Sequence, residues 1–445
     1  MRNGFRHNAN AVVEHSLAIK GGNSMRGFGH EGNISISCCI VKKSGSVLNN
    51  GQCDTVIASC SFFGYHEINS INNPRRRSMP VTLLFVFSAI YIIMILAFAV
   101  AAATSTVRPD DGYRPRVSII IAARNEEEQI ASCLDSITAL TYPTDLLDVI
   151  VVDDRSTDGT GDIVTGYTSR HSHIHLLRID TDTGLPPGKT SAVTVAADKA
   201  SGEILMFTDA DCRVPPRWVE NTVTHYSNAS VGVVAGFTSL VGETPFEEMQ
   251  ALDWFVLFSV AAATTRLGFP VTAVGTNLSV RRKAYDSVGG YRKIPFSVTE
   301  DYALFHAVTS TGKWKARFPM DRETLVQSTP CKNLPQLFSQ KKRWFTGGRG
   351  MDAKSLVIFA FPYLFNLLIL LGVFLTPWWA VSLAVGVKLA VDFLLCLPAV
   401  RTFRRPSLLL AYPLFEFYYY IYVLLFPPLV MFGAEITWKE RTFRN

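Results

Sequence analysis

The sequence predicts an α/β domain with a mostly parallel, doubly wound sheet, combined with transmembrane α-helices. Two observations predict this fold class. Between residues 114 and 350, strand-like and helix-like segments alternate, which is typical of βαβ units. On both sides of that segment lie long uncharged runs with the length and apolarity of helices that cross a bilayer. We therefore expect a soluble domain over 114–350, flanked by an anchor helix and a C-terminal bundle.

The composition narrows the class of protein. Hydrophobic types make up 48% of the 445 residues and charged types 18%, whereas soluble chains carry roughly 25% charged residues. This excludes a disordered chain, and eight cysteines are too few for a disulfide scaffold. The formal net charge of +6 suggests nucleic acid or an anionic membrane surface. Residues 1–78, however, hold nine Lys/Arg and four Asp/Glu, which accounts for five of those six charges. We therefore expect no nucleic-acid partner.

The anchor helix is predicted over residues 79–107. Between Arg77 and Arg108 the sequence has no charged residue, and about 20 apolar residues are enough to span a bilayer core. The C-terminal bundle is predicted over 355–433 and is followed by a tail, 434–445.

The bundle contains three further apolar runs, 355–376, 378–400 and 408–433. Lys388 and Asp392, in the second of these, share a helix face at a spacing of four. We expect them to neutralise each other inside the bundle rather than to form an ion pathway. The third run holds Glu416 and the pair Pro427-Pro428, which favours an interfacial or broken helix.

The positive-inside rule leads to a conflict about orientation. PRRRS, at 74–78, places the N-terminus in the cytoplasm and the soluble domain outside. RTFRR, at 401–405, lies two spans beyond the domain and places both itself and the domain in the cytoplasm. We hypothesise that translation starts at Met79 and that 1–78 is a mis-assigned extension; the alternative is a disordered leader. Detection of any peptide from residues 4–42 in the native protein would refute the hypothesis.

The predicted strands of the soluble domain end in polar residues. Val117–Arg124 and Leu146–Asp154 are rich in β-branched residues, which is typical of buried parallel strands, and Glu203–Asp211 is predicted as another buried strand that ends in acids. Asn125 is expected to cap the helix after the first strand, with acids in its first turn. Ligands bind at the carboxyl ends of strands in such sheets. The site candidates at these ends are Arg124, Asn125, Glu126, Asp153, Asp154, Asp209 and Asp211.

Asp209 and Asp211 are the strongest of these candidates for binding a metal. At a spacing of two on a strand end, both carboxylates face one side. Two such hard oxygen ligands suit Mg²⁺ or Mn²⁺ shared with a substrate diphosphate.

GLPPGKT, at Gly184–Thr190, resembles a P-loop but departs from it. The Walker pattern needs four residues between its glycines, and here there are three. Two of those three are prolines, which lack the N–H groups that bind phosphate. A membrane-anchored P-loop NTPase remains the alternative of another class, and Lys189 can reach a phosphate as a single charge.

Four further segments lie in the second half of the chain, each with an expected structure or role. Ala273–Tyr291 is expected to form a strand, a turn and a short helix. Glu300 and Asp301 stand at a helix start, where first-turn acids are also simply stabilising. Pro335–Gly348 is amphipathic and basic, and a membrane-interface helix is its alternative role. Pro245–Leu267 is predicted either at the membrane surface or as a buried core helix.

Six short blocks, taken together, resemble the family 2 glycosyltransferases, which are membrane-bound, inverting enzymes with a GT-A fold. In family order they are ARNEE, DDRSTDGT, GKT, DAD, TED and QKKRW, between Val117 and Trp344. The chain is also similar to bacterial lipid glycosyltransferases and to QxxRW polysaccharide synthases. The resemblance departs at Arg155, where many relatives have Gly; the Arg could change the turn or contact phosphate.

The resemblance implies a role for each matching residue. The residues that it implies bind the nucleotide sugar are Asn125, Glu126, Asp153, Asp154, Lys189 and Asp209. Asp209 and Asp211 match the metal motif, and Asp211 matches the direct ligand. Asp301 matches the general base, with Glu300 beside it. Gln340, Arg343 and Trp344 match the motif beside the diphosphate and the acceptor.

We therefore expect a multi-pass protein of the cell (inner) membrane with a cytoplasmic catalytic domain. It would transfer a sugar from a nucleotide-diphosphate sugar, a UDP-sugar foremost, to a lipid or growing glycan acceptor, with Mg²⁺ or Mn²⁺ as cofactor. A processive polysaccharide synthase is the alternative within the same family, and a catalytically silent scaffold is the alternative outside it.

Overall fold

A computed structural model describes residues 74–105, 112–181, 184–185, 188–348, 351–431, 435–438 and 441–444. The hypothesis about a mis-assigned leader concerns residues 1–78 and so lies almost entirely outside the described residues. The last of these, 74–78, are described as the first turns of a helix, α2 (Pro74–Ala103).

Seven strands of the described chain form one sheet. Their order is β3 (Ile174–Arg178), β2 (Leu147–Asp153), β1 (Val117–Ala123), β4 (Ile204–Asp209), β7 (Leu278–Arg281), β5 (Val231–Ala235) and β8 (Lys315–Arg317). Strands β3, β2, β1 and β4 pair in parallel, as do β5 and β8, whereas β7 runs antiparallel to both of its neighbours. The predicted α/β class with a mostly parallel sheet is therefore confirmed.

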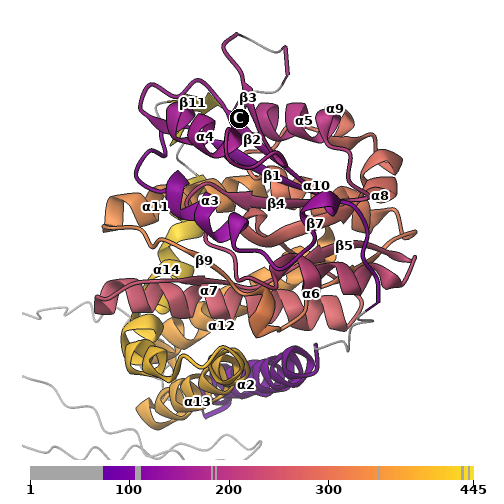
Figure 1. Cartoon of the computed structure of the whole chain (residues 1–445). Helices are drawn as coiled ribbons and strands as arrows, with labels where there is room; N and C mark the ends of the chain where they lie inside the picture. The colour runs from indigo at the N-terminus through magenta and orange to yellow at the C-terminus, as the bar shows by residue number, and fades with distance from the viewer. Residues whose placement is uncertain are drawn as a thin grey trace, which may run out of the picture. The chain divides into compact units, whose positions relative to one another are not determined.

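Helices cover both faces of this sheet (Figure 1). Alternate residues of β1 belong to different cores: Ile119 and Ile121 pack in one, and Ile120 in the other. The first core is closed by α3 (Ile130–Thr138), α4 (Thr160–Thr168) and α6 (Trp218–Thr224). The second is closed by α5 (Lys189–Lys199), α7 (Pro245–Arg266), α8 (Arg282–Ser287) and α10 (Glu300–Ser310). This is the doubly wound arrangement that the βαβ pattern predicts.

The remaining described elements are short or lie near the C-terminus. They are η1 (Thr144–Leu146), η2 (His225–Ser227), β6 (Thr238–Leu240), η3 (Gly275–Asn277), α9 (Gly290–Lys293), η4 (Arg322–Thr324), β9 (Val326–Ser328), α11 (Leu334–Gly347), α12 (Ala353–Leu375), α13 (Trp378–Thr402), η6 (Pro406–Ala411), α14 (Tyr412–Met431), β10 (Glu435–Trp438) and β11 (Arg441–Arg444). Strands β6 and β9 form a small parallel sheet, and β10 and β11 pair beside α11.

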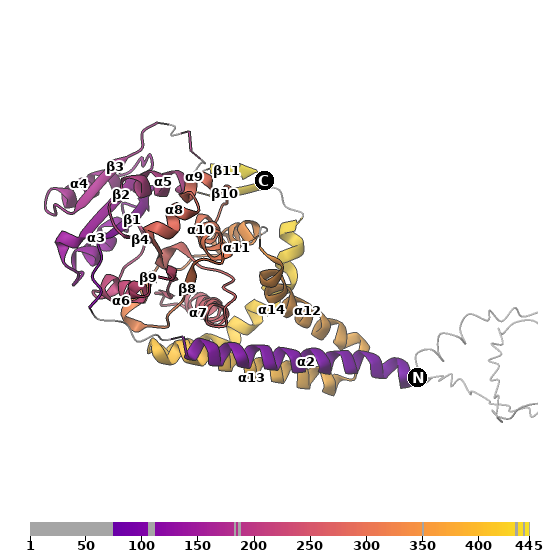
Figure 2. The ribbon, with the colours of Figure 1, turned by 90° about the vertical axis from the view of Figure 1, so that its right-hand side faces the viewer.

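Four helical stretches of the described chain are long and apolar enough to cross a membrane. They are Met79–Ala103, Ala353–Leu375, Trp378–Thr402 and Pro406–Pro428. Helices α2 and α13 lie side by side (Figure 2). Large apolar side chains on these helices are exposed, for example Phe374 and Trp378, each 80% accessible. Such a surface is unfavourable in water and suits hydrocarbon.

The fourth apolar run differs from its prediction. The chain forms a 3₁₀ turn at η6 and then a continuous helix, α14, which is not interrupted at Pro427 or Pro428. Prolines are tolerated within apolar helices when neighbouring helices satisfy the freed backbone groups. Helix α14 packs against α7, α11 and α12, which supplies such neighbours.

The ionisable residues of the bundle meet as predicted. Lys388 Nζ lies 2.7 Å from Asp392 Oδ2, so the expected neutral pair is confirmed. The structure adds two partners from other helices. Glu416 Oε2, on α14, lies 2.6 Å from the same Nζ, and the Tyr91 hydroxyl, on α2, donates to Asp392 Oδ1 at 2.7 Å. These contacts tie α2, α13 and α14 together.

Helix α7 adopts the core alternative rather than the membrane-surface one. It begins at a capping box, in which Thr244 Oγ1 accepts from the Glu247 N–H and the Glu247 carboxylate accepts from the Thr244 N–H. Most of its length is buried, with Phe255 and Phe258 against Phe237 of the domain. It packs against α2, α13 and α14 as well. Helix α7 therefore joins the sheet domain to the apolar helices.

The RTFRR segment contacts the domain directly. Arg405 Nη2 lies 3.1 Å from Glu248 Oε1 on α7, and Arg405 Nη1 donates to Ser239 Oγ at 3.2 Å. The segment after α13 therefore packs against the sheet domain.

Candidate active site

Strand register brings the polar strand ends together. In the parallel pairs of β1, Ala123 lies beside Asp153 of β2 and Ala122 lies beside Asp209 of β4. The carboxyl ends of the three strands therefore meet at one edge, where this class of sheet binds ligands.

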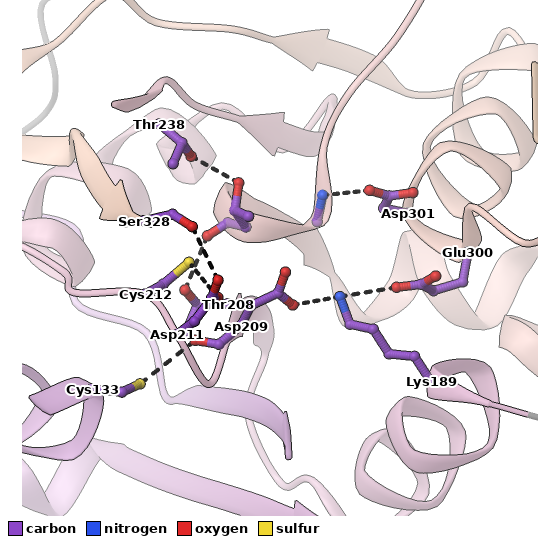
Figure 3. A network of polar contacts seen from close by, with 12 residues as sticks. Cys133, Lys189, Thr208, Asp209, Asp211, Cys212, Thr238, Glu300, Asp301 and Ser328 are labelled. Atoms are coloured by element: carbon purple, nitrogen blue, oxygen red, sulfur yellow. Dashed lines mark hydrogen bonds and ion pairs between the residues drawn. The ribbon is translucent and has the colours of Figure 1, made fainter. Parts of the chain in front are cut away.

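Lys189 contacts two acids near this edge, Asp209 and Glu300 (Figure 3). It is the first residue of α5 and follows Gly188, whose φ of 81° is a conformation that favours glycine. Its Nζ lies 2.5 Å from Asp209 Oδ1 and 3.0 Å from Glu300 Oε1. Burial opposes the charged ammonium, but the negative charges of Asp209, Glu300 and Asp301 outweigh it and raise the pKa of Lys189. Lys189 is therefore a fixed positive charge among acids.

Asp211 is held in the turn after β4. Its Oδ2 accepts from the Ser328 hydroxyl at 3.2 Å, and the Cys212 thiol lies 3.5 Å from its Oδ1. Burial and the nearby charge of Asp209 raise the pKa of this carboxyl group. Two acids that repel each other in one turn form a site that a cation would stabilise.

The fit of a divalent ion to this turn can be judged from its donor set. The described residues contain no cluster of three or more His, Cys, Asp or Glu that could hold an ion alone. Asp209 and Asp211 supply two carboxylates, so further ligands must come from water or a bound phosphate. This matches the way in which Mg²⁺ is usually held beside phosphates, and we conclude that the residues fit such an ion.

Asp301 stands next to this cluster with a different environment. Its Oδ2 accepts from the Gly275 N–H at 2.6 Å and its Oδ1 from the Tyr302 N–H at 2.7 Å. It forms no salt bridge with any described residue. Burial and the charge of Glu300 raise its pKa to about 6, although Lys189 and the two backbone donors act in the opposite direction. A carboxylate with a pKa near neutrality suits a general base.

Gly275 allows Asp301 and Lys189 to approach the turn before β7. A Cβ at this position would lie 3.1 Å from Asp301 Cβ and 3.4 Å from Lys189 Nζ. The turn is further fixed by Thr276, whose carbonyl accepts from Thr208 Oγ1 at 3.0 Å and whose hydroxyl contacts Thr238 Oγ1 at 2.8 Å. The sequence predicts only a strand, a turn and a short helix over this segment, although a glycine inside such a pattern indicates close approach.

Ser328 was not foreseen either. It follows Asp211 by 117 residues and reaches it because β9 ends beside the turn of β4. A single serine in a polar segment carries no sequence signal for such a contact.

Asn125 does not cap α3 as predicted, because that helix begins at Ile130. Asn125 instead takes a left-handed φ of 51°, and its Oδ1 accepts from the Thr157 N–H at 2.8 Å. The Glu126 N–H donates to Thr160 Oγ1 at 2.8 Å. The ARNEE loop therefore forms hydrogen bonds with the DDRSTDGT loop. Asn125 takes part in these bonds in place of the predicted helix cap.

The DDRSTDGT loop places its two acids differently. Asp153 Oδ1 accepts from the Ser156 N–H at 3.0 Å, whereas Asp154 Oδ1 lies 2.8 Å from Arg155 Nη2. Arg155 has a φ of 58°, the conformation a glycine would adopt. The departure from the family pattern therefore leaves a left-handed turn, and the guanidinium pairs with Asp154.

Helix α11 carries the QKKRW segment. Trp344 packs against Trp254 of α7, with ring centroids 5.5 Å apart. Gln340 Oε1 is buried and has no hydrogen-bond partner among the described residues. Near its end, Gly347 lies so close to Thr299 that a Cβ would come within 2.0 Å of Thr299 Oγ1. Helix α11 therefore contacts the residue that precedes Glu300 and Asp301.

Arg343 and Asp211 act on a common neighbour, the Cys331 thiol. Burial raises the pKa of this thiol, the positive charges of Lys341 and Arg343 lower it, and the negative charge of Asp211 raises it. The charges of the QKKRW arginine and of the second DAD acid therefore both act on this thiol.

Comparison with known proteins gives matches over both halves of the chain. A model of glycosyl transferase family 2 matches residues 118–289. A model of glycosyl transferase family group 2 matches residues 204–434, which is more than half of the chain.

Two curated relatives and one solved structure illustrate the likeness. Glycosyltransferase AglE of Haloferax volcanii is 31% identical over 180 residues, 40% of this chain and 56% of the relative. A beta-monoglucosyldiacylglycerol synthase of Nostoc sp. is 29% identical over 261 residues, 56% of this chain and 52% of the relative. The chain thus spans about half the length of these relatives. The mannosyltransferase PcManGT from Pyrobaculum calidifontis, solved with GDP-Man and Mn²⁺, is 21% identical with a TM-score of 0.51, covering 74% of this chain and 98% of that one. This likeness supports the GT-A fold.

Proposed function

The chain belongs to glycosyl transferase family group 2, and on that premise we propose that it transfers a sugar from a nucleotide-diphosphate sugar to a lipid or glycan acceptor. One observation carries the proposal. Lys189 is held between Asp209 and Glu300, while Asp301 stands beside them without a salt bridge to any described residue. A fixed cation and a separate carboxylate are the two groups that sugar transfer from a diphosphate requires.

The donor side of the site is built around the departing diphosphate. Asp209 and Asp211 would hold a divalent ion, Mg²⁺ or Mn²⁺, which would stabilise the negative charge that develops on the leaving phosphate. Lys189 contributes a fixed positive charge at the same edge, and Arg343 a second one from α11. We propose that Asn125, Glu126, Asp153 and Asp154 surround the base and ribose of a UDP-sugar, because their loops form the neighbouring part of the edge.

Asp301 acts on the acceptor in this scheme. As the acceptor hydroxyl oxygen forms its bond to the anomeric carbon, its proton passes to the Asp301 carboxylate, and the bond from that carbon to the diphosphate oxygen breaks. The Gly275 and Tyr302 N–H groups hold the carboxylate in place for the transfer. A single in-line attack of this kind inverts the anomeric configuration.

The apolar helices support a membrane location and a lipid acceptor. The four stretches long enough to cross a bilayer carry exposed apolar side chains, and α7 and α11 connect them to the site. One relative is named for the synthesis of a glucosyl lipid. We propose an anchor over 79–107, a bundle over 355–433 and a catalytic domain in the cytoplasm.

The test is a transfer assay on membranes that contain the full chain. Membranes are incubated with radiolabelled UDP- and GDP-sugars, and the product is partitioned between organic solvent and aqueous polymer. We expect label in the lipid phase, lost with EDTA and restored by Mn²⁺ or Mg²⁺. Membranes with Asp209→Asn/Asp211→Asn serve as the matched control. Polymer of increasing length would instead favour a processive synthase, and hydrolysis of ATP without sugar transfer would overturn the proposal.

A further inference from the structure

Helix α11 contains a lysine where an apolar residue is expected. In α11, which is described over its whole length, Leu337, Lys341 and Thr346 are buried and the other side chains are at least partly exposed. Lys341 is 4% accessible. Lysine is almost never buried to this degree without a partner, so we expect a group of opposite charge beside it.

The charge is held by α7. Lys341 Nζ forms an ion pair with Asp253 Oδ2, and Asp253 is itself 6% accessible. The ammonium also lies 4.7 Å from the ring centroid of Trp344 and 5.2 Å from that of Tyr422 on α14. Cations over aromatic faces are attracted by the ring quadrupole, more strongly when water is excluded.

The pair contacts Trp344, which belongs to the QKKRW segment. Lys341 precedes Trp344 by three residues on α11, and Trp254 follows Asp253 on α7. The two tryptophan rings contact each other at 5.5 Å, and the ammonium contacts the Trp344 ring. The Trp344 ring therefore contacts the ammonium of the pair and the tryptophan that follows its carboxylate partner in α7.

A stability role alone does not explain the choice of charges. Apolar residues of similar volume in place of a buried ion pair are often as stabilising or more so, and α7 and α11 already offer apolar neighbours here. A charge pair does something that an apolar contact does not: it penalises every register in which the two groups fail to meet.

We propose that Lys341 and Asp253 form a positioning pair that sets the orientation of Trp344, a residue of the segment that the resemblance implies lies beside the acceptor. The expected effect on acceptor use rests on the proposed function. We assign no contact of Lys341 or Asp253 with substrate. The two residues act through Trp344, which extends from the same helix as Gln340 and Arg343.

The first test observes Trp344 directly and needs no substrate. The full chain is labelled with 5-fluorotryptophan in detergent, and the Trp344 and Trp254 resonances are assigned with Trp344→Phe and Trp254→Phe. In Lys341→Met/Asp253→Leu we expect the Trp344 resonance to broaden or split, while those of Trp378 and Trp379 stay unchanged. Lys342→Met, which removes a charge one residue further along α11, is the matched control. An unchanged Trp344 resonance in the double variant would overturn the inference.

The second test separates acceptor use from donor use. UDP-glucose is the donor probe and dioleoylglycerol in mixed micelles the acceptor probe. In the double variant we expect the acceptor KM to rise about 10- to 100-fold, as for a group misplaced by about 1 Å. Hydrolysis of UDP-glucose without acceptor should stay within about threefold of the unmodified chain, and Lys341→Arg should recover most acceptor use.

The outcomes distinguish the inference from the proposed function. Equal loss of acceptor use and donor hydrolysis, or no loss of either, would overturn the positioning role. If the unmodified chain neither transfers nor hydrolyses any nucleotide sugar, the proposed function fails, and the fluorine spectra still decide whether the pair orients Trp344.

Discussion

The described chain contains two lysines that are each held between two carboxylates, one at the sheet edge and one in the helix bundle. Lys189 lies 2.5 and 3.0 Å from Asp209 and Glu300, and Lys388 lies 2.7 and 2.6 Å from Asp392 and Glu416. The distances are alike, but the surroundings are not. The Lys189 side chain is 20% accessible and that of Lys388 is 4% accessible.

The same ion-pair geometry serves different ends in the two regions. At the sheet edge, further carboxylates, Asp211 and Asp301, stand next to the cluster, and the edge is where ligands bind in such sheets. In the bundle, Tyr91 closes the cluster from a third helix. We infer that the first cluster is available to substrates and that the second joins helices.

The largest expected effect is on turnover, and it concerns Asp301. The cluster in the helix bundle has no counterpart of this residue among those described above. In Asp301→Asn we expect turnover to fall about 10²- to 10⁴-fold, because the amide cannot accept the acceptor proton. Binding of the nucleotide sugar, measured by calorimetry, should change little. Turnover within about threefold of the unmodified chain would remove Asp301 as the base.

The next effect concerns the bundle. Lys388→Met leaves Asp392 and Glu416 buried without their cation, which typically costs about 3–5 kcal/mol. We expect a large drop in the thermal midpoint in detergent. The control is Lys388→Met/Asp392→Leu/Glu416→Leu, which removes all three charges and should recover much of the loss. A single variant as stable as the unmodified chain would show that the cluster does not hold the helices.

The matching change at the sheet edge should affect binding more than stability. Lys189→Met removes a charge that we place at the diphosphate, and hydrogen bonds to charged groups contribute about 1.5–3 kcal/mol. We expect the affinity for the nucleotide diphosphate to fall about 10- to 100-fold. The thermal midpoint should fall less than in Lys388→Met, because water reaches this cluster. A larger loss of stability than in Lys388→Met, with unchanged affinity for the nucleotide diphosphate, would contradict the role of Lys189 at the diphosphate.

The smallest effect is a shift of the pH profile. The pKa of Asp301 is raised to about 6, so its base form is lost as the pH falls through about 6, and kcat/KM should fall with it. Glu300→Gln removes a charge that raises this pKa and should move the limb to lower pH. Lys189→Met removes a charge that lowers it and should move the limb to higher pH. Shifts of the same sign in both variants would contradict this assignment.

The same pKa has a consequence for folding. A carboxyl group whose pKa is higher in the folded chain than in the unfolded chain binds its proton more tightly when folded. Ionisation of Asp301 therefore lowers the free energy of unfolding as the pH rises from the ordinary aspartate value of 3.8 toward 6. Asp301→Asn should remove this dependence, which pH-resolved melting curves can detect.

Local patterns in the sequence determined the parts of this protein that depend on neighbouring residues. The apolar runs before Asp153 and Asp209 form parallel strands, and the long apolar runs outside the domain form helices. Lys388 and Asp392 could be paired in advance because a helix brings residues four apart onto one face. Such features follow from backbone periodicity alone.

Only the tertiary structure decided which distant groups meet. Lys189 and Asp209 are 20 residues apart, Asp253 and Lys341 88, and Asp211 and Ser328 117. Tertiary contacts also explain why Asn125 bonds to the DDRSTDGT loop instead of capping α3, and why α7 is buried. These contacts depend on the order of the strands in the sheet and on how the helices pack against it. The arrangement minimises exposed apolar area and unpaired charge over the whole domain, and no local segment contains that information.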